Sequence, residues 1–274
     1  MFQPIISIIV PCYNQAQYLD ECLESVLDQS FQNWECIIVN DGSPDTTDYV
    51  AKNWLKKDSR FIYLKKENGG VASARNFGIF HSKGEWILPL DGDDKIGKDY
   101  LFLASQQFDK NPHIIYCKGE YFGTISYKMI MNNFTQEDIL LENPIFCSSF
   151  FKKEAWEKIK GYDENMLDGY EDWEFWISMY SYYNHLTTIM LDYTGFSYRI
   201  KEISRNTEAV KVHDKKIREY IFKKHSDLYC KNIHNFSNYF KDLKHYKKEN
   251  ILLREKLSAK RYQCIDKILS IFNL

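Results

Sequence analysis

Three carboxylates stand within four residues in the segment Asp91-Gly92-Asp93-Asp94, directly after the apolar run 86–90. Carboxylates this close repel one another unless a cation or several hydrogen-bond donors compensate them. Oxygen ligands of this kind suit Mg²⁺ or Mn²⁺, which commonly bind a protein carboxylate and a substrate phosphate together. The segment therefore predicts a metal that joins the protein to a diphosphate. The alternative is an acidic turn in which Asp94 caps the following helix.

A second acidic pair, Glu171-Asp172, opens a predicted helix over 171–182. A carboxylate within hydrogen-bond reach of a hydroxyl can act as a general base. Acidic residues are also favoured in the first turn of any helix, because they offset the helix dipole. The pair is therefore either a catalytic base with its neighbour or a helix-terminal charge. Trp173 and Trp176 belong to an apolar stripe that is more typical of core packing than of a ligand site.

The first hundred residues alternate between short apolar runs and helical periodicity. Buried strands are predicted at 5–10, 36–39, 61–64 and 86–90, and helices at 18–27, 46–55 and 71–80. Strands alternating with helices in this way predict an α/β fold with a parallel sheet and right-handed crossovers.

A polar turn follows each of these four strands, at 11–14, 40–43, 67–70 and 91–94. Ligands of open α/β sheets bind at the carboxyl ends of the strands, so we expect all four turns to meet at one edge. Arg75, on the helix after the third turn, should lie beside them. The sequence therefore predicts a binding site at this edge.

The pattern beyond residue 110 is mixed. Strands are predicted at 114–122, 187–191 and 196–198, helices at 153–159 and 171–182, and helical structure from about 206 to the end.

Five segments, in this order and spacing, resemble the GT-A family 2 glycosyltransferases, which are inverting enzymes that use nucleotide sugars. The segments are Ile8–Asn14, Val39–Asp45, Asn68–Asn76, Leu90–Asp94 and Asp168–Trp176. The resemblance covers roughly residues 4–205. It implies a GT-A (Rossmann-like), mostly parallel sheet flanked by helices over 1–205, with a nucleotide-binding half at about 1–110 and an acceptor half at about 111–205. A basic helical C-terminal extension, 206–274, would follow.

The resemblance implies a role for each matching position in the nucleotide-binding half. Asp41 resembles the carboxylate that bonds the uracil or ribose, and Pro11 and Tyr13 resemble the lip on which the base stacks. The residues expected to bind the nucleotide are Pro11, Tyr13, Asn14, Asp41, Ser43, Arg75 and Asp91.

At the reacting end, Asp91 and Asp93 resemble the two aspartates of the DxD motif, with Asp93 the direct ligand of Mn²⁺ or Mg²⁺. Asp172 resembles the catalytic base, with Glu171 as its partner. Trp173, Arg199 and Asp94 are expected near the acceptor or the diphosphate, where Trp173 would stack on a sugar ring.

One position departs from the family pattern. Many relatives carry a histidine in the segment that here reads Tyr198-Arg199-Ile200-Lys201-Glu202-Ile203-Ser204, where Lys201 takes its place. A lysine can substitute by charge but cannot ligate a metal in the same way.

The resemblance implies an inverting, metal-dependent hexosyl- or N-acetylhexosaminyltransferase. Its donor would be a nucleotide sugar, with UDP favoured, and its acceptor a hydroxyl of a saccharide or lipid-linked saccharide in bacterial surface polysaccharide or lipopolysaccharide synthesis. One alternative is a sugar nucleotidyltransferase, which would need a Gly-rich basic loop that the segment 11–14 does not supply. The other is a protein that binds nucleotide sugars without transferring them.

Charge divides the chain unevenly. Residues 1–210 carry 20 Lys and Arg against 31 Asp and Glu, or −11, and residues 211–274 carry 16 against 7, or +9, which together give the net −2. A basic amphipathic tail predicts contact with an anionic membrane surface. Packing on the acidic body and formation of a homodimer are the alternatives. A nucleic-acid partner is not expected, because the tail has no known motif and the body is acidic.

Composition narrows the class of protein further. The seven cysteines are scattered singly over the 274 residues, which argues against a disulfide framework or a zinc site. No apolar run approaches the length of a membrane-spanning helix, and no signal peptide is recognisable. We therefore expect a cytoplasmic protein, peripheral on the inner face of the cell membrane if the tail binds there.

Overall fold

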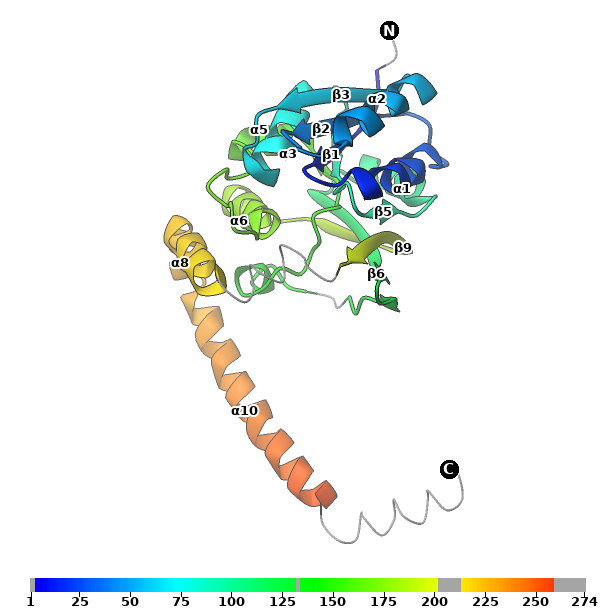
Figure 1. Cartoon of the computed structure of the whole chain (residues 1–274). Helices are drawn as coiled ribbons and strands as arrows, with labels where there is room; N and C mark the ends of the chain where they lie inside the picture. The colour runs from blue at the N-terminus through cyan, green and yellow to red at the C-terminus, as the bar shows by residue number, and fades with distance from the viewer. Residues whose placement is uncertain (1–2, 132–133, 202–212, 259–274) are drawn as a thin grey trace, which may run out of the picture. The chain divides into compact units, whose positions relative to one another are not determined.

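The structure is a computed structural model that describes residues 3–131, 134–201 and 213–258 (Figure 1). Contacts divide the chain into two compact units, Met1–His225 and Ser226–Leu274, which are described separately. The first unit extends beyond the segment that the sequence assigns to the glycosyltransferase domain. It does so because helix α8 (Asp214–Lys224) packs on it, with Ile217 and Ile221 buried.

Among its described residues the first unit contains nine strands, three of them only two residues long, and seven α-helices besides short 3-10 turns. The strands are β1 (Ile6–Cys12), β2 (Trp34–Asp41), β3 (Phe61–Lys66), β4 (Trp86–Pro89), β5 (Lys95–Ile96), β6 (Ile114–Gly123), β7 (Tyr127–Lys128), β8 (Phe151–Lys152) and β9 (Thr188–Ile200). The helices are α1 (Ala16–Leu27), α2 (Thr47–Lys57), α3 (Gly70–His81), α4 (Tyr100–Ser105), α5 (Lys153–Ile159), α6 (Glu171–Tyr183) and α8.

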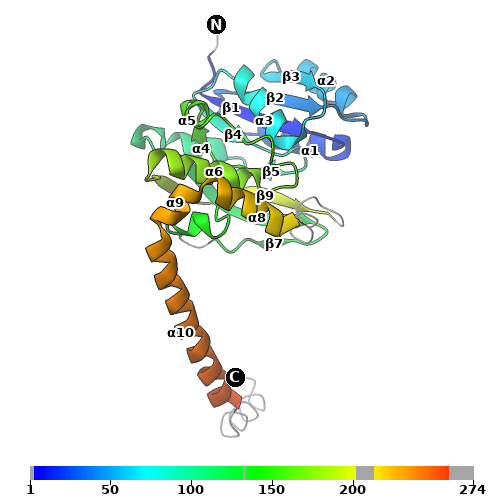
Figure 2. The ribbon, with the colours of Figure 1, turned by 90° about the vertical axis from the view of Figure 1, so that its left-hand side faces the viewer.

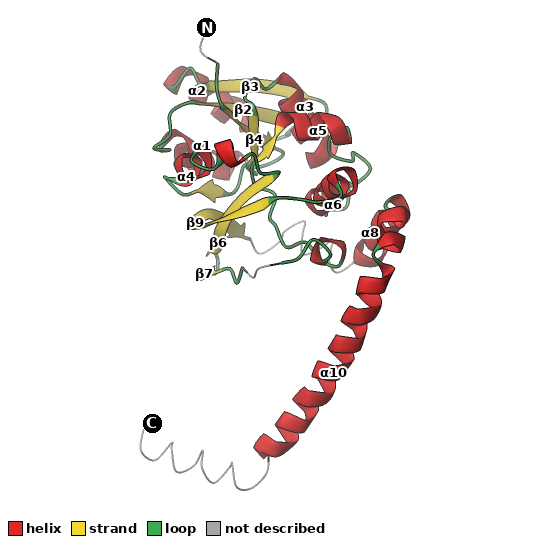
Figure 3. Ribbon diagram, turned by 180° about the vertical axis from the view of Figure 1, so that it is seen from behind, coloured by secondary structure: helices red, strands yellow, loops and turns green. Residues whose placement is uncertain are grey.

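Five strands form the main sheet in the order β3-β2-β1-β4-β8. The first four run parallel and β8 is antiparallel to β4, so the mostly parallel α/β fold predicted from the sequence is confirmed (Figure 3). A second sheet has the order β5-β9-β6-β7, with β6 and β9 parallel.

Strand β1 is buried along its whole length because helices cover both faces of the main sheet. On one face, Ile8 and Val10 pack into a core with Leu23 of α1. On the other face α3 lies so close that a Cβ on Gly78 would stand 2.6 Å from Cγ2 of Ile9. Close packing of α3 holds the turn before it against the carboxyl ends of β1 and β2.

The sequence prediction differs from the structure mainly after β4. The two strands predicted at 187–191 and 196–198 are one strand, β9, whose pairing with β6 is irregular at Lys118. The short elements β5, α4, β7 and β8 were not predicted, because two to six residues carry too little periodicity to be recognised. Figure 2 shows α6 and α8 as neighbours in the first unit.

The second unit contains α9 (Ser226–Lys231) and the 26-residue helix α10 (Ile233–Ser258). Phe236 is buried, and its ring lies 5.9 Å from that of Tyr229. The rest of the predicted tail, 259–274, lies outside the described residues, as do 206–212. Within the described ranges, no helix has the length and apolar character needed to cross a membrane.

Candidate active site

A pocket of about 390 Å³ opens at the carboxyl ends of β1, β2 and β4, beside the end of β9, and this volume is typical of small-molecule sites. The predicted convergence of the polar turns is therefore observed. The pocket is lined by Pro11, Cys12, Tyr13, Gln15, Asp41, Asn68, Gly70, Val71, Ala74, Asp91, Asp93, Tyr198, Arg199 and Lys201.

Asp41, the last residue of β2, is held at one end of this pocket. The Lys66 ammonium donates to Oδ1 at 2.8 Å, and the backbone N–H groups of Gly69 and Gly70 donate to Oδ1 at 3.0 Å and Oδ2 at 2.8 Å. Gly70 has φ +86°, a left-handed conformation that favours glycine. The carboxylate thus fixes the turn before α3.

Asn14 and Ser43, which the sequence placed in the nucleotide site, lie next to the pocket but do not line it. The Asn14 backbone N–H donates to the Ser43 hydroxyl at 3.2 Å, and that hydroxyl donates to the Cys12 carbonyl at 3.2 Å. These bonds tie the turns after β1 and β2 together. Tyr13 lines the pocket with half of its surface exposed.

Arg75 of α3 is fully buried and bridges two acidic segments that are 80 residues apart. Its Nη2 donates to Asp91 Oδ1 at 2.7 Å and its Nη1 donates to Glu171 Oε1 at 2.9 Å. Burial lowers the pKa of Arg75, but the Asp91 and Glu171 carboxylates outweigh it and raise that pKa, so the guanidinium stays charged. The sequence predicts that Arg75 holds the nucleotide; in the structure it joins the turn after β4 to the start of α6.

Asp172 is the second residue of α6 and is half-buried. Asn143 Nδ2 donates to its Oδ2 at 3.1 Å, and the Trp173 backbone N–H donates to its Oδ1 at 2.8 Å. Burial, and then the charge of neighbouring Glu171, raise the pKa of Asp172 to about 6. A carboxylate with this pKa is ionised at neutral pH and can accept a proton.

Two basic residues of β9 and its end meet the turn after β4. The Lys201 ammonium pairs with Asp93 Oδ2, and Arg199 Nε donates to the Asp93 carbonyl at 2.7 Å. The Arg199 backbone N–H donates to Asp94 Oδ1 at 2.8 Å, and its guanidinium pairs with Glu21. Burial, followed by the charge of Asp91, raises the pKa of Asp93, which Lys201 opposes.

Asp94 differs from the other two carboxyls of this turn because it is buried and does not line the pocket. Burial, and then the charges of Asp93 and Asp91, raise its pKa well above the usual value.

The residues at this turn do not fit a divalent metal as they stand. The Asp93 carboxylate is bonded to an ammonium, and one oxygen of Asp91 is bonded to Arg75. Within the described part of the chain, no group of three or more His, Cys, Asp or Glu side chains is arranged to hold a metal ion. Mg²⁺ or Mn²⁺ at Asp93 would have to displace Lys201.

Trp173 does not lie where the sequence predicted a sugar contact. It is 2% exposed, its indole N–H donates to the Ile139 carbonyl at 2.6 Å, and the Arg218 guanidinium of α8 lies 4.7 Å from its ring. The protein itself covers the ring, as the apolar stripe of α6 indicated.

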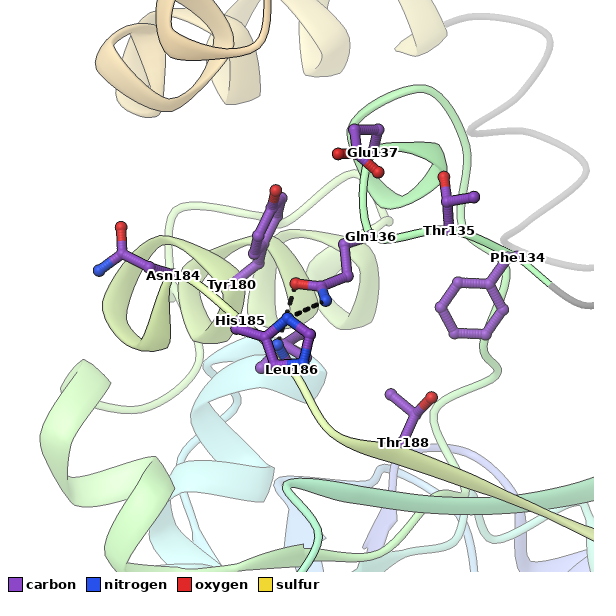
Figure 4. Close-up of a pocket in the computed structure, with 9 residues that line it drawn as sticks. All are labelled: Phe134, Thr135, Gln136, Glu137, Tyr180, Asn184, His185, Leu186 and Thr188. Carbon is purple, nitrogen blue, oxygen red and sulfur yellow. Dashed lines mark hydrogen bonds between the residues drawn. The ribbon is translucent and has the colours of Figure 1, made fainter. Parts of the chain in front are cut away.

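A second pocket, of about 450 Å³, lies at the other end of α6 from Asp172 and contains none of the predicted site residues (Figure 4). In it, Gln136 Nε2 and His185 Nδ1 are 2.5 Å apart, and the Leu186 backbone N–H donates to Gln136 Oε1 at 3.0 Å. The pocket is lined by Phe134, Thr135, Gln136, Glu137, Tyr180, Asn184, His185, Leu186 and Thr188.

Sequence reasoning missed two contacts of the site. Asn143 is 29 residues before Asp172 and belongs to no motif, so nothing in the sequence connects the two. Lys66 precedes the Glu67–Gly70 turn and reads as the end of a strand. Lys201 was noted only as a departure from the family pattern, yet it contacts a predicted metal ligand.

Solved structures with a similar fold are glycosyltransferases of the GT-A type. S. aureus TarS, residues 1–349, in complex with UDP-GlcNAc matches with a TM-score of 0.64 and 22% identity, over 76% of this chain and 61% of that chain. The mannosyltransferase PcManGT from Pyrobaculum calidifontis, in complex with GDP-Man and Mn²⁺, matches with a TM-score of 0.60 and 20% identity, over 84% of this chain and 70% of that chain.

Curated relatives share more sequence over shorter segments. The chain is 38% identical over 108 residues to the uncharacterized glycosyltransferase EpsJ of Bacillus subtilis. The aligned segment covers 39% of this chain and 31% of EpsJ. It is 36% identical over 177 residues to the minor teichoic acid biosynthesis protein GgaB of the same organism. That alignment covers 60% of this chain and 20% of GgaB. The chain thus spans under a third of these two relatives.

The family model for Glycosyl transferase family 2 matches residues 7–167, which include the Asp41 turn, Arg75 and the Asp91–Asp94 turn. More than half of the chain is covered, and the same residues build the pocket at the carboxyl edge of the sheet. The chain therefore belongs to glycosyl transferase family 2.

Proposed function

We propose that this protein transfers a sugar, with inversion, from a nucleotide-sugar donor to a hydroxyl of a saccharide or lipid-linked saccharide. The observation that carries the proposal is the buried bridge Asp91–Arg75–Glu171. It fixes the start of α6, and so the half-buried Asp172, relative to the pocket at the ends of β1, β2 and β4. A base and a nucleotide pocket held in one rigid arrangement are what a displacement at a bound donor requires.

The proposed reaction is a single displacement in which no enzyme-bound sugar forms. Asp172 takes the proton from the acceptor hydroxyl. The acceptor oxygen attacks the anomeric carbon of the donor sugar as the bond between that carbon and the diphosphate oxygen breaks. Negative charge then develops on the leaving nucleoside diphosphate, which cations at the Asp91–Asp94 turn would stabilise. Asp172 retains the proton until it exchanges with solvent.

The donor is proposed to bind along the pocket, with its base near Pro11, Tyr13 and Asp41 and its diphosphate near Asp93. UDP is the favoured nucleotide, and the TarS structure with UDP-GlcNAc supports this choice. GDP is the alternative that the PcManGT structure with GDP-Man supports. In this assignment residues 1–110 bind the nucleotide and residues 111–205 bind the acceptor, apart from Arg199 and Lys201, which line the nucleotide's pocket.

The sugar transferred is proposed to be a hexose or N-acetylhexosamine, and the product a bacterial surface polysaccharide or lipopolysaccharide. The name of GgaB, a minor teichoic acid biosynthesis protein, supports a role at the cell surface. Contact of the basic C-terminal extension with an anionic membrane, from the cytoplasmic side, would bring the enzyme to a lipid-linked acceptor. A homodimer through this extension is the alternative.

A thermal-shift panel of UDP-, dTDP- and GDP-sugars tests the proposal. A ligand that binds only the folded state adds about 2.7 kcal/mol of stability at 100 times its Kd. We expect a shift with one nucleotide class, and release of that nucleoside diphosphate when a saccharide acceptor is supplied. The sequence predicts dependence on Mn²⁺ or Mg²⁺, but Lys201 is already bonded to Asp93, so each donor is measured with metal and with EDTA.

Two other outcomes would indicate a different function. A shift without turnover for any acceptor, unchanged by Asp172→Asn, would indicate a nucleotide-sugar-binding protein. Release of pyrophosphate from a nucleoside triphosphate and a sugar phosphate would indicate a nucleotidyltransferase. The absence of a shift with every nucleotide sugar would contradict the proposed function.

A further inference from the structure

The Lys201 ammonium lies at the place in the pocket where the sequence predicts a metal. It pairs with Asp93 Oδ2 and lies 4.6 Å from the centre of the Tyr18 ring. The side chains of Lys201 and Asp93 are 22% and 16% exposed, so the pair is largely shielded but still open to the pocket. Such a pair is screened less by solvent than one on the surface.

Each carboxylate that lines the pocket is paired with a cation of the protein. The Asp41 carboxylate is compensated by Lys66, and the Asp91 carboxylate by Arg75. Asp93 is compensated by Lys201. Arg75 is shared with Glu171, and Arg199 is the other cation of the lining, whereas a bound diphosphate would add two or more negative charges.

We propose that Lys201 supplies the positive charge that holds the donor's diphosphate, in place of a divalent metal. The inference rests on the proposed function. An ammonium has three N–H donors and no acceptor. Among the described residues Asp93 is the carboxylate that Lys201 contacts, so further donors can reach phosphate oxygens while the ion pair is kept.

Arg199 is placed to assist. Its guanidinium lines the same pocket, 4.6 Å from the same Tyr18 ring. Its Nε is fixed by the Asp93 carbonyl, and Nη2 pairs with Glu21. Arg199 belongs to β9 and Lys201 directly follows its last residue, and their side chains are held by ion pairs with Glu21 and Asp93. Fixed cations of this kind stabilise a leaving anion without reorganisation.

The chemistry of the donor set favours the ammonium over a metal. Mg²⁺ demands a nearly octahedral set of oxygens and retains several waters. Here one Asp91 oxygen is committed to Arg75, and the Asp94 carboxyl is buried and does not line the pocket. Asp93 would be left as the main protein ligand, and Lys201 would have to move away from it.

Calorimetric titration of the full chain with UDP, GDP and dTDP, in Mn²⁺ and in EDTA, tests this inference. We expect one nucleoside diphosphate to bind the wild-type chain with a Kd that is the same in both conditions. In EDTA, Lys201→Ala should weaken binding about tenfold or more, as expected when one charged hydrogen-bond partner is lost. Mn²⁺ should restore binding to Lys201→Ala, because Asp93 is then free.

Lys95→Ala is the matched control. Lys95 is a neighbouring lysine in an ion pair with Glu21, but it does not line the pocket. The Lys95→Ala variant should bind the nucleotide with the same Kd as the wild type. Lys201→Arg, which keeps the charge, should retain binding in EDTA, and thermal unfolding of each variant checks that it is folded. Loss of the free Mn²⁺ signal in electron paramagnetic resonance reports metal binding directly.

Wild-type binding that EDTA abolishes would overturn the inference and leave the proposed function standing. Binding by Lys201→Ala in EDTA with the wild-type Kd would do the same. If no nucleoside diphosphate binds in either condition, it is the proposed function that fails, and the inference fails with it.

Discussion

The two ends of the pocket hold their carboxylates in different ways. At the Asp41 end, one carboxylate is bonded by Lys66, Gly69 and Gly70, which lie 25 to 29 residues away in the next strand and turn. At the Asp91 end, Arg75 bonds Asp91, 16 residues away, and Glu171, 96 residues away, and Lys201 bonds Asp93. The Asp41 end is therefore built from consecutive strands and turns, whereas the Asp91 end also joins the turn to α6 and to the end of β9.

The difference matters for chemistry. At the Asp41 end, two of the three donors are backbone N–H groups of the turn before α3, so this end of the pocket is held by the backbone. The cations at the Asp91 end are side chains that face both protein carboxylates and the pocket, so a ligand can share them. A charge balance that a ligand can alter is expected where a diphosphate binds and departs.

The largest expected effect separates the two ends by function. Asp172→Asn removes the proposed base without touching the Asp41 end, so turnover should fall about 10²- to 10⁴-fold while nucleotide affinity is kept. Initial rates of nucleoside diphosphate release measure the loss. Asp168→Asn, the same substitution in the preceding turn, is the control and should stay near wild type. A loss below about tenfold would indicate that another group is the base.

Stability should separate the two ends as well. Arg75→Met leaves the Asp91 and Glu171 carboxylates without their buried partner, so the free energy of unfolding should fall by about 3–5 kcal/mol. Lys66→Met leaves the buried Asp41 carboxylate with two backbone donors and should cost less, about 1–3 kcal/mol. Urea unfolding of both variants measures the difference. Equal losses would mean that the Asp41 end depends on its cation as much as the Asp91 end does.

The pH dependence of transfer should follow the Asp91 end alone. The base must be ionised, and burial and Glu171 raise the pKa of Asp172 to about 6. The rate should therefore be level above this pH and fall about tenfold per pH unit below it. Glu171→Gln removes the neighbouring charge and should move the fall to lower pH. A profile that is flat down to pH 5 would exclude Asp172 as the base.

The smallest expected effect concerns the Asp41 end. Tyr13 is 50% exposed at the lip of the pocket, so Tyr13→Ala should weaken nucleotide binding by about 1–3 kcal/mol through lost stacking. Its effect on the free energy of unfolding should stay within about 0.5 kcal/mol. Tyr49→Ala, at an exposed residue of α2, is the control for a surface tyrosine. Unchanged nucleotide affinity in Tyr13→Ala would mean that the nucleobase does not stack on Tyr13.

Much of the framework could be predicted from the sequence because it depends on local signals. The apolar run at β1, the helical spacing of α1 and the polar turns after β2 and β4 each lie within a dozen residues, and each formed where expected. The convergence of these turns then follows from the topology of a parallel sheet. The helix over Glu171–Tyr183 is recognisable for the same reason.

The partners of the site residues were decided only by the tertiary structure. Nothing near Arg75 in the sequence shows that its guanidinium lies between Asp91 and Glu171, and nothing near Asp172 indicates Asn143. The stripe of α6 indicated that Trp173 packs in the core, but not that Arg218 of α8 lies over its ring.

Residue types and spacing thus determined which groups stand at the edge of the sheet, because strand ends and turns are local features of the chain. Which charges neutralise them was decided by contacts between Asp93 and Lys201, 108 residues apart. Electrostatic compensation depends on distance in space, and only the packed fold sets that distance.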